Sequence, residues 1–308
     1  MSVIGIDTSN YTTSIAYFDG ETGVNCSRLL PVKPGELGLR QSDAVFAHTK
    51  SLPDLSGRLF SNAEVGKITA VGVSTRPRAV EGSYMPCFMV GYSHAKLLSD
   101  ALGVPLIEVS HQQGHVAASL WSAGHLELME EPHLAWHLSG GTTELLLVEP
   151  DGKNVKCTKI GGTTDISAGQ LIDRTGIMLD LPFPAGKHVD ALSKEATMKE
   201  TFKVKCPGME FSLSGVQNKV QQFHQRNGVP AETAAFALRC VASAVFQATR
   251  NALKAYSGLK VVFSGGVASN SMLREVIAPL NPIFCEPQYS TDNAMGVAVL
   301  TYRYTQEG

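Results

Sequence analysis

The sequence carries two histidines four residues apart, in the stretch VSHQQGHVAASLW at residues 109–121. On an α-helix this spacing sets His111 and His115 on one face, one turn apart, where both imidazoles can reach a single cation. A third ligand must come from a distant segment, and Asp292 is a candidate because a carboxylate can complete a two-histidine site. Histidines four apart also occur by chance in cores and on surfaces, so spacing alone leaves both interpretations open.

The same pair does not indicate a zinc peptidase. Peptidases with the H-E-x-x-H motif use a glutamate directly after the first histidine as general base, and Gln112 occupies that place here. Glutamine cannot accept a proton, so the pattern disfavours metal-dependent peptide hydrolysis.

Two similar strand–turn–strand patterns must position these residues. VIGIDTSNYTTSIAYFDG (3–20) and LAWHLSGGTTELLLVEPDG (134–152) each run from an apolar strand through a small polar turn to a second strand and an Asp-Gly reversal. Because the pattern recurs about 130 residues later, we predict a duplicated α/β fold whose halves span residues 1–130 and 131–308. The first half carries the two histidines, and the second carries the glycine turns and Asp292.

Strands and helices alternate along both halves, which predicts a mixed α/β sheet in each. Short β-rich runs lie at 68–75 and 104–110, and we predict helices near 85–102, 166–178, 231–256 and 267–276. A last helix is expected to begin within STDNAMG (290–296), capped by Ser290, Thr291 or Asp292.

Three turns of small residues follow apolar strands: DTSN (7–10), LSGGTT (138–143) and FSGGVASN (263–270). Small residues let a ligand approach the backbone, and exposed N–H groups at such turns suit phosphate oxygens. One such turn is common in any α/β protein, but three in this order predict a nucleotide cleft.

Composition and charge narrow the class of protein. The formal net charge of -2 gives no general electrostatic footprint for nucleic acid, so an RNA partner must meet a local basic patch or be bound with another subunit. The six cysteines are scattered, as expected of reduced thiols. The first residues lack the pattern of a signal peptide and no segment reads as a membrane span. We therefore expect a cytoplasmic protein without a membrane partner.

Taken together, the motifs resemble those of the bacterial TsaD family, formerly called Gcp or O-sialoglycoprotein endopeptidase. The resemblance covers residues 3–300 and rests on GIDTS, HQQGH, LSGGT, AGQLIDRTG, FPAGK, FSLSG, SGGVASNSMLR and TDNAMG, in that order. It implies an actin/hexokinase/Hsp70-like fold of two RNase H-like halves around a nucleotide cleft. It also implies transfer of a threonylcarbamoyl group from threonylcarbamoyl-AMP to the adenosine next to the anticodon of tRNA.

The resemblance further implies ligands and partners. One divalent metal ion, iron or zinc, would be held by His111, His115 and Asp292, which would act in catalysis through that metal. An adenine nucleotide, threonylcarbamoyl-AMP or ATP, would be the second ligand, and proteins like TsaB and TsaE would be partners beside the tRNA. The residues implied to contact the nucleotide or substrate are His137, Leu138, Ser139, Gly140, Gly141, Asp173, Gly186 and Asn270.

Three of these residues, Asp173, Gly186 and Asn270, also have a purely structural interpretation. Asp173 could accept hydrogen bonds from ribose hydroxyls or form a salt bridge on a helix surface. Gly186 could admit a ligand or serve a turn with positive φ. Asn270 could contact the nucleotide or cap a helix.

Several positions depart from the family pattern. Tyr11 and Thr12 replace two acidic residues of the first loop, and Thr142 replaces a histidine after the S-G-G turn. Arg76 and Arg78 replace glycines of a G-P-G loop. These changes predict a divergent paralogue, so two alternatives stay open. One is a carbamoyl-type transferase or nucleotide-binding enzyme that acts on another acceptor. The other is a non-catalytic scaffold that dimerises with a related protein.

Overall fold

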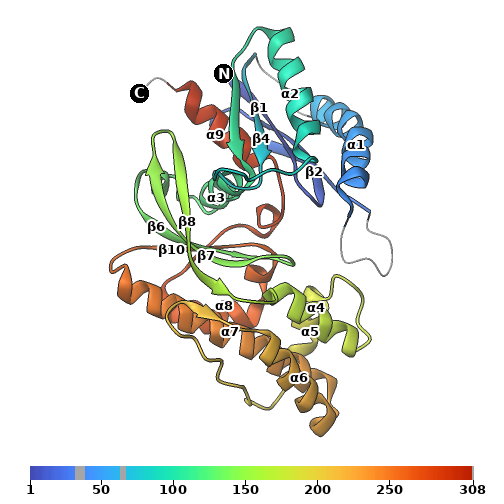
Figure 1. Cartoon of the computed structure of the whole chain (residues 1–308), viewed down its shortest axis with the longest axis vertical. Coiled ribbons are helices and arrows are strands. Elements are labelled where there is room, and N and C mark those ends of the chain that lie inside the picture. Colours follow the sequence, from blue (N-terminus) through green and yellow to red (C-terminus); the bar gives the residue numbers. More distant parts are fainter. Residues whose placement is uncertain (32–38, 63–66, 307–308) are drawn as a thin grey trace. The chain divides into compact units, whose positions relative to one another are not determined.

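The chain folds into two compact units, each built on one β-sheet (Figure 1). The computed structural model describes residues 1–31, 39–62 and 67–306. Unit 1 comprises Met1–Glu131, Glu149–Cys157 and Asp292–Gly308, and unit 2 comprises Pro132–Val148 and Thr158–Thr291.

The sheet of unit 1 has the strand order β3-β2-β1-β4-β5. Strands β1 (Ser2–Thr8), β2 (Thr12–Phe18) and β3 (Gly23–Leu29) form an antiparallel meander, and β4 (Ile68–Arg76) and β5 (Leu106–Ser110) continue the sheet parallel to β1. β1 and β2 are buried along their whole length, and their buried residues include polar ones such as Asp7, Thr12 and Thr13.

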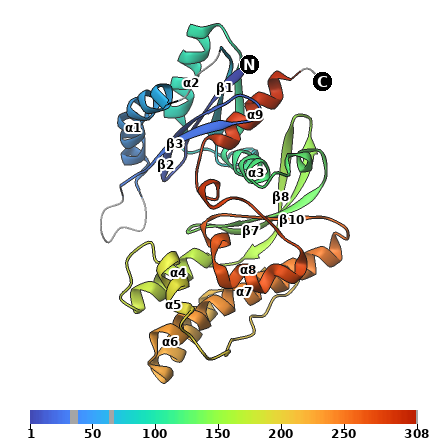
Figure 2. The ribbon, with the colours of Figure 1, turned by 180° about the vertical axis from the view of Figure 1, so that it is seen from behind.

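Helices cover both faces of this sheet. α1 (Gln41–Asn62) and α2 (Phe88–Leu102) pack on one face, and α9 (Met295–Thr305) packs on the other with α3 (His111–Ser122) beside it (Figures 1 and 2). Glycines explain how close α9 lies. A Cβ on Gly5 would stand 2.6 Å from the backbone nitrogen of Ala298, and one on Gly72 would overlap the Thr301 side chain. Small residues on the central strands therefore bring α9 against the sheet.

The sheet of unit 2 repeats that order. Its strands run β11 (Ile283–Phe284), β10 (Val261–Ser264), β6 (His133–Leu138), β7 (Thr143–Asp151), β8 (Asn154–Thr163) and β9 (Glu210–Phe211). β6 and β7 are antiparallel, whereas β10 and β11 run parallel to β6. The succession β8-β7-β6-β10-β11 thus matches β3-β2-β1-β4-β5, and the predicted duplication is confirmed.

The helices of unit 2 lie on one side of its sheet in both views (Figures 1 and 2). They are α4 (Ala168–Met178), α5 (Gly186–Ser193), α6 (Ser214–Asn227), the long α7 (Pro230–Ala255) and α8 (Ser271–Ile277). The core between them centres on Trp136, whose Nε1 donates to Thr249 Oγ1 of α7 at 2.9 Å. Short 3-10 turns lie at Leu126–Glu130, Gly266–Ser269, Ala278–Leu280 and Pro287–Tyr289.

Three expectations about the chain differ from the structure. The last helix begins at Met295 with Ala294 as its N-cap residue, so Ser290, Thr291 and Asp292 do not cap it. The helix expected from residue 267 is a 3-10 turn followed by α8. The segment Asp292–Gly308, expected in the second half, groups with unit 1 because α9 packs against β1, β4 and α3.

All six cysteines are free thiols, in agreement with their scattered spacing. Among the described residues, none of the helices combines the length and the apolar character that crossing a bilayer requires.

Candidate metal centre and nucleotide-binding turns

The two histidines lie on the first turns of α3, directly after β5. Ser110 caps this helix: its Oγ accepts from the backbone N–H of Gln113, and Gln113 Oε1 accepts in return from the backbone N–H of Ser110. This reciprocal capping box fixes the first turn and therefore the direction of His111. The Gln113 amide also donates to the Val155 carbonyl at 2.8 Å, which ties the turn to the rest of unit 1.

A glycine pair brings Asp292 to these histidines. α3 and α9 cross where Gly114 faces Gly296, so closely that a Cβ on Gly296 would stand 1.7 Å from the Gly114 carbonyl oxygen. Because Gly114 directly precedes His115 and Asp292 lies just before α9, this crossing carries the carboxylate to the imidazoles. Unit 1 thus assembles the three predicted ligands from two distant segments.

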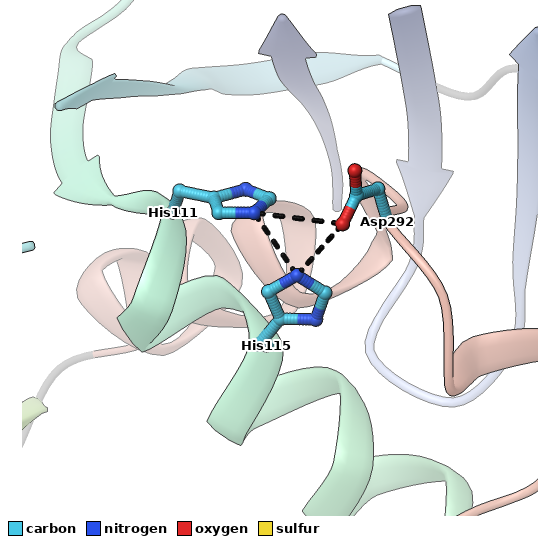
Figure 3. Close-up of side chains that lie close together, drawn as sticks. All are labelled: His111, His115 and Asp292. Carbon is cyan, nitrogen blue, oxygen red and sulfur yellow. Dashed lines mark hydrogen bonds and ion pairs between the residues drawn. The ribbon is translucent and has the colours of Figure 1, made fainter. Parts of the chain in front are cut away.

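The three ligand atoms converge on one point, as Figure 3 shows. His115 Nε2 lies 3.0 Å from His111 Nε2 and 3.1 Å from Asp292 Oδ1, and His111 Nε2 lies 3.6 Å from the same oxygen. The imidazole rings stand nearly perpendicular, at 80°, with centroids 4.4 Å apart. His115 is buried, and His111 and Asp292 are partly exposed. One side of the cluster is therefore open to a ligand.

The chemistry of this donor set fits a divalent transition metal. Two imidazole nitrogens that face each other at 3.0 Å repel unless a proton or a cation lies between them. In a tetrahedral site with bonds of about 2.1 Å, neighbouring donors lie roughly 3.4 Å apart, close to the spacing observed here. Two histidines and one carboxylate suit zinc or iron, and three protein ligands leave a position for substrate.

Asp7, at the end of β1, supports the cluster from behind. Its side chain is fully buried, and Oδ1 accepts from His111 Nδ1 at 3.0 Å and from the Ser74 hydroxyl. A hydrogen on Nδ1 leaves the Nε2 lone pair free to point at the cation. Ser9 Oγ donates to Asp292 Oδ2 at 3.1 Å and so orients the carboxylate.

Sequence reasoning did not identify Asp7, Ser9 or Ser74 as parts of this centre. The small residues of the turn DTSN predicted a phosphate contact and not a support for the metal ligands. A buried aspartate at the end of an apolar strand was the available signal, since such a carboxylate needs a charged or donating partner.

The electrostatics favour positive charge at the cluster. Burial alone would lower the pKa of His111, but the carboxylates of Asp7 and Asp292 outweigh burial and hold that pKa well above its ordinary value. Burial alone would raise the pKa of Asp292, but its hydrogen bonds to His111 and His115 hold that pKa well below its ordinary value. The Asp292 carboxylate therefore stays ionised and attracts a proton or a metal ion.

In unit 2, the turn between β6 and β7 leaves its glycines open. Ser139 Oγ accepts from the backbone N–H of Thr142, and Ser167 Oγ donates to the Gly140 carbonyl at 2.6 Å, which fixes the turn against the start of α4. A Cβ on Gly140 or Gly141 would meet nothing within 4 Å. Backbone at these two glycines can be approached closely. His137 lies half-buried in β6 and Leu138 is fully buried, so Leu138 has a core position.

The other predicted nucleotide contacts also lie in unit 2. Asp173 on α4 is half-buried, and its Oδ1 accepts from the Ala185 N–H at 2.8 Å, so no surface salt bridge accounts for it among the residues with described positions. Burial raises its pKa. Gly186 opens α5 without positive φ, and space lies where its Cβ would be. Asn270 caps α8 through the Leu273 N–H at 3.0 Å, so its structural interpretation is confirmed.

The residues that depart from the family pattern lie in turns or at strand ends. Tyr11 is 40% exposed in the β1–β2 turn, and Thr12 is buried at the start of β2. Arg76 ends β4 and is exposed, as is Arg78 in the following turn. Thr142 is half-buried in the glycine turn.

Comparison with known proteins identifies the family. The model of the family "TsaD: tRNA N6-adenosine threonylcarbamoyltransferase" matches residues 37–299. A protein of Carboxydothermus hydrogenoformans named tRNA N6-adenosine threonylcarbamoyltransferase is 34% identical over 83% of this chain and 77% of its own length. Among solved structures, full-length HypF matches 100% of this chain and 47% of its own, with TM-score 0.63 and 14% identity.

A second solved structure, the ROK hexokinase from Thermus thermophilus, covers 99% of this chain and 100% of its own, with TM-score 0.53 and 15% identity. These two likenesses concern the fold alone, and they confirm the predicted actin/hexokinase-like architecture. On the strength of the family match and the relative, this chain belongs to the TsaD family of tRNA N6-adenosine threonylcarbamoyltransferases.

Proposed function

We propose that this protein transfers a threonylcarbamoyl group from threonylcarbamoyl-AMP to the exocyclic amine of the adenosine next to the anticodon of tRNA. One iron or zinc ion, held by His111, His115 and Asp292, supports the reaction. The observation that carries the proposal is the convergence of these three ligand atoms within 4.8 Å of one another, in a chain of this family.

The reaction needs no protein nucleophile. The adenosine nitrogen attacks the carbamoyl carbon of the mixed anhydride, the C–O bond to phosphate breaks, AMP departs and the attacking nitrogen loses one proton. The bound metal would supply Lewis-acid polarisation of substrate oxygens. Asp7 keeps the hydrogen of His111 on Nδ1, and Ser9 holds the Asp292 carboxylate, so the donor atoms need little rearrangement to act.

The groups of unit 2 suit the adenine nucleotide. The open backbone at Gly140 and Gly141 and the N-terminus of α5 at Gly186 offer N–H groups to phosphate oxygens. The Asp173 carboxylate offers an acceptor to ribose hydroxyls, with Oδ1 already fixed by Ala185. His137 and Ser139 would border this ligand, and Asn270 would act by holding the start of α8.

Partners of two kinds follow from this function. The substrate would be tRNA, and proteins like TsaB and TsaE would assist turnover in the cytoplasm, in a homo- or heterodimeric assembly. Since Tyr11 and Thr12 stand where the family pattern has acidic residues, the proton of the attacking amine would leave to a substrate phosphate or to water. Transfer of a carbamoyl-type group to another acceptor is the competing function.

The first test is metal content together with product analysis. Protein purified without a histidine tag should hold about one equivalent of iron or zinc by elemental analysis, and His115→Ala should lose it. With threonylcarbamoyl-AMP and unmodified tRNA, the wild-type protein with its partners should form threonylcarbamoyladenosine. Mass spectrometry of nucleosides detects this product. The rate should fall at least 100-fold in His115→Ala, the effect expected on removing a metal ligand.

Asn251→Ala is the matched control, because Asn251 lies on α7 of unit 2 and not among the metal ligands. A protein that holds metal but leaves tRNA unmodified would favour the other acceptor. A protein that stays metal-free after anaerobic reconstitution would exclude the proposed centre.

A further inference from the structure

Unit 2 contains a hollow that the proposed reaction does not use. It has a volume of about 380 Å³ and its lining combines aromatic rings with charged groups. Phe223 and Phe236 stack with centroids 4.4 Å apart and planes at 6°, and both are buried. Phe202 is 37% exposed and also lines the hollow. The remaining lining residues are Glu200, Thr201, Lys219, Gln222 and Arg226.

The segment that bears Phe202 is held firmly although it has no regular secondary structure. Side chains of α7 hold this segment through hydrogen bonds. Glu232 accepts from the backbone N–H groups of Thr197 and Met198, the Arg239 guanidinium donates to the Glu200 carbonyl at 3.1 Å, and Cys240 Sγ accepts from the Phe202 N–H at 3.3 Å. The hollow is therefore preformed, which lowers the entropic cost of filling it.

Two cations border the aromatic rings. Lys219 Nζ lies 5.8 Å from the centroid of Phe202, and the Arg226 guanidinium lies 5.4 Å from that of Phe223. The Glu200 carboxylate, the one acidic group of the lining, is paired with Arg226 at 2.6 Å. Lys219 contributes positive charge that this acidic group does not balance, and its ammonium donates to the neutral amide of Gln222.

The surrounding sequence is strongly basic. Residues 187–260 hold eleven lysines and arginines against five aspartates and glutamates, a formal charge of +6, whereas the whole chain carries -2. This stretch of unit 2 is thus net basic, although the whole chain is slightly acidic, and net positive charge favours contact with a polyanion such as RNA.

We propose that this hollow binds an unpaired nucleotide of RNA, with the base against Phe202 and the neighbouring phosphates beside Lys219 and Arg226. Proteins that bind single-stranded RNA combine aromatic rings with cationic side chains. The rings stack on the bases, and the cations pair with the phosphates. The volume is at the small end of ligand pockets, roughly 300–1,000 Å³, and suits one nucleotide rather than a duplex. The inference rests on the proposed function, because it names a second contact with the same tRNA.

An RNA-binding measurement with a matched control tests the inference. The double variant Phe202→Ala with Lys219→Glu removes the ring and reverses the charge. The control is Phe46→Ala with Lys50→Glu, because Lys50 Nζ also lies 5.4 Å from the ring centroid of Phe46, on the exposed surface of α1. Fluorescence anisotropy of a labelled unmodified tRNA transcript gives Kd at several salt concentrations, and thermal unfolding verifies that each variant is folded.

We expect the double variant to bind tRNA at least tenfold more weakly, with a smaller slope of log K against log salt, by about one for each cation lost. The control should stay within twofold of the wild type. Phe202→Ala alone, which keeps the charge, should weaken binding without changing the salt slope.

Four outcomes would overturn the inference: no tRNA binding by the wild type, equal Kd values for wild type and double variant, equal losses in double variant and control, or displacement of tRNA by polyglutamate as effectively as by RNA. Product analysis separates this result from the proposed function. Threonylcarbamoyladenosine formed by a double variant with unchanged Kd refutes the hollow alone, whereas RNA binding through the hollow without modified adenosine refutes the reaction alone.

Discussion

His111 makes a different contact through each of its ring nitrogens, and this division decides what the residue can do. Nδ1 faces the buried carboxylate of Asp7, and Nε2 faces His115 and Asp292. A hydrogen held on Nδ1 makes Nε2 a lone-pair donor, and the negative charge behind the ring strengthens that donor. The spacing of His111 and His115 predicted that both could reach one cation. It held no information about Asp7, which contacts Nδ1 of His111.

The contribution of Asp7 can be measured as metal affinity. Asp7→Asn keeps the shape and a hydrogen-bonding oxygen but removes the charge, so we expect metal affinity to fall by about 10- to 100-fold. Competition with a chromogenic chelator gives the dissociation constant. Asp54→Asn is the control, because Asp54 forms an exposed ion pair with Arg28 on the surface of unit 1. Equal affinities of Asp7→Asn and the wild type would show that Asp7 has no part in metal binding.

The crossing of α3 and α9 determines whether the three proposed ligands meet. The contact of Gly114 with Gly296 is closer than any side chain permits, and both glycines neighbour the ligand motifs, HQQGH and TDNAMG. The ligand site is thus a product of helix packing as much as of ligand identity.

Gly296→Ala tests this packing. The added Cβ would overlap the Gly114 carbonyl, so α9 must shift, and we expect a loss of roughly 3 kcal/mol or more in the free energy of unfolding. Metal content should fall as well, because Asp292 moves with the start of α9. Gly57→Ala is the control: this helical glycine of α1 has open space at its Cβ, so alanine should stabilise by about 0.5–1 kcal/mol. Urea unfolding gives both values, and a Gly296→Ala protein with full metal content would contradict the argument.

How far the sequence predicted these elements depends on the kind of signal each carries. The helix expected at 231–256 is α7 at Pro230–Ala255, because a long apolar periodicity with Pro at its first turn is a strong local pattern. α1 was missed, since it contains Pro53 and has a balanced polar composition. The predicted start of α9 is too early because Asp292 is a residue type that often caps helices. Its carboxylate instead contacts His111, His115 and Ser9.

Unit 1 is assembled from three separate stretches of chain. The segment that begins at Asp292 supplies both a ligand and α9, which covers β1 and β4. Local sequence patterns predicted a boundary between the two halves near residue 131. They could not show that the chain returns to unit 1 after completing unit 2. Long-range packing against the glycine-bearing strands, rather than order along the chain, decides that assignment.

Ending the chain at Thr291 tests this organisation, and each unit has its own reporter. Trp121 on α3 packs edge-on against Phe18 at 5.8 Å, and Phe18 in turn contacts Tyr302 of α9 at 5.4 Å; Trp136 is buried in the core of unit 2. Without α9, the face of β1 and β4 loses its cover, so we expect the half-buried Trp121 to become more accessible and the proposed metal site to lose its third ligand, Asp292. Trp136 should stay buried in the core of unit 2, where it also donates a hydrogen bond to Thr249.

Emission wavelength and acrylamide quenching of the variants Trp121→Phe and Trp136→Phe, in full-length and shortened chains, assign the signals. A shortened chain in which Trp121 is as protected as in the full-length protein would mean that unit 1 folds without its last segment. If Trp136 became exposed along with Trp121, the core of unit 2 would depend on unit 1, and the division into separately stable units would be wrong.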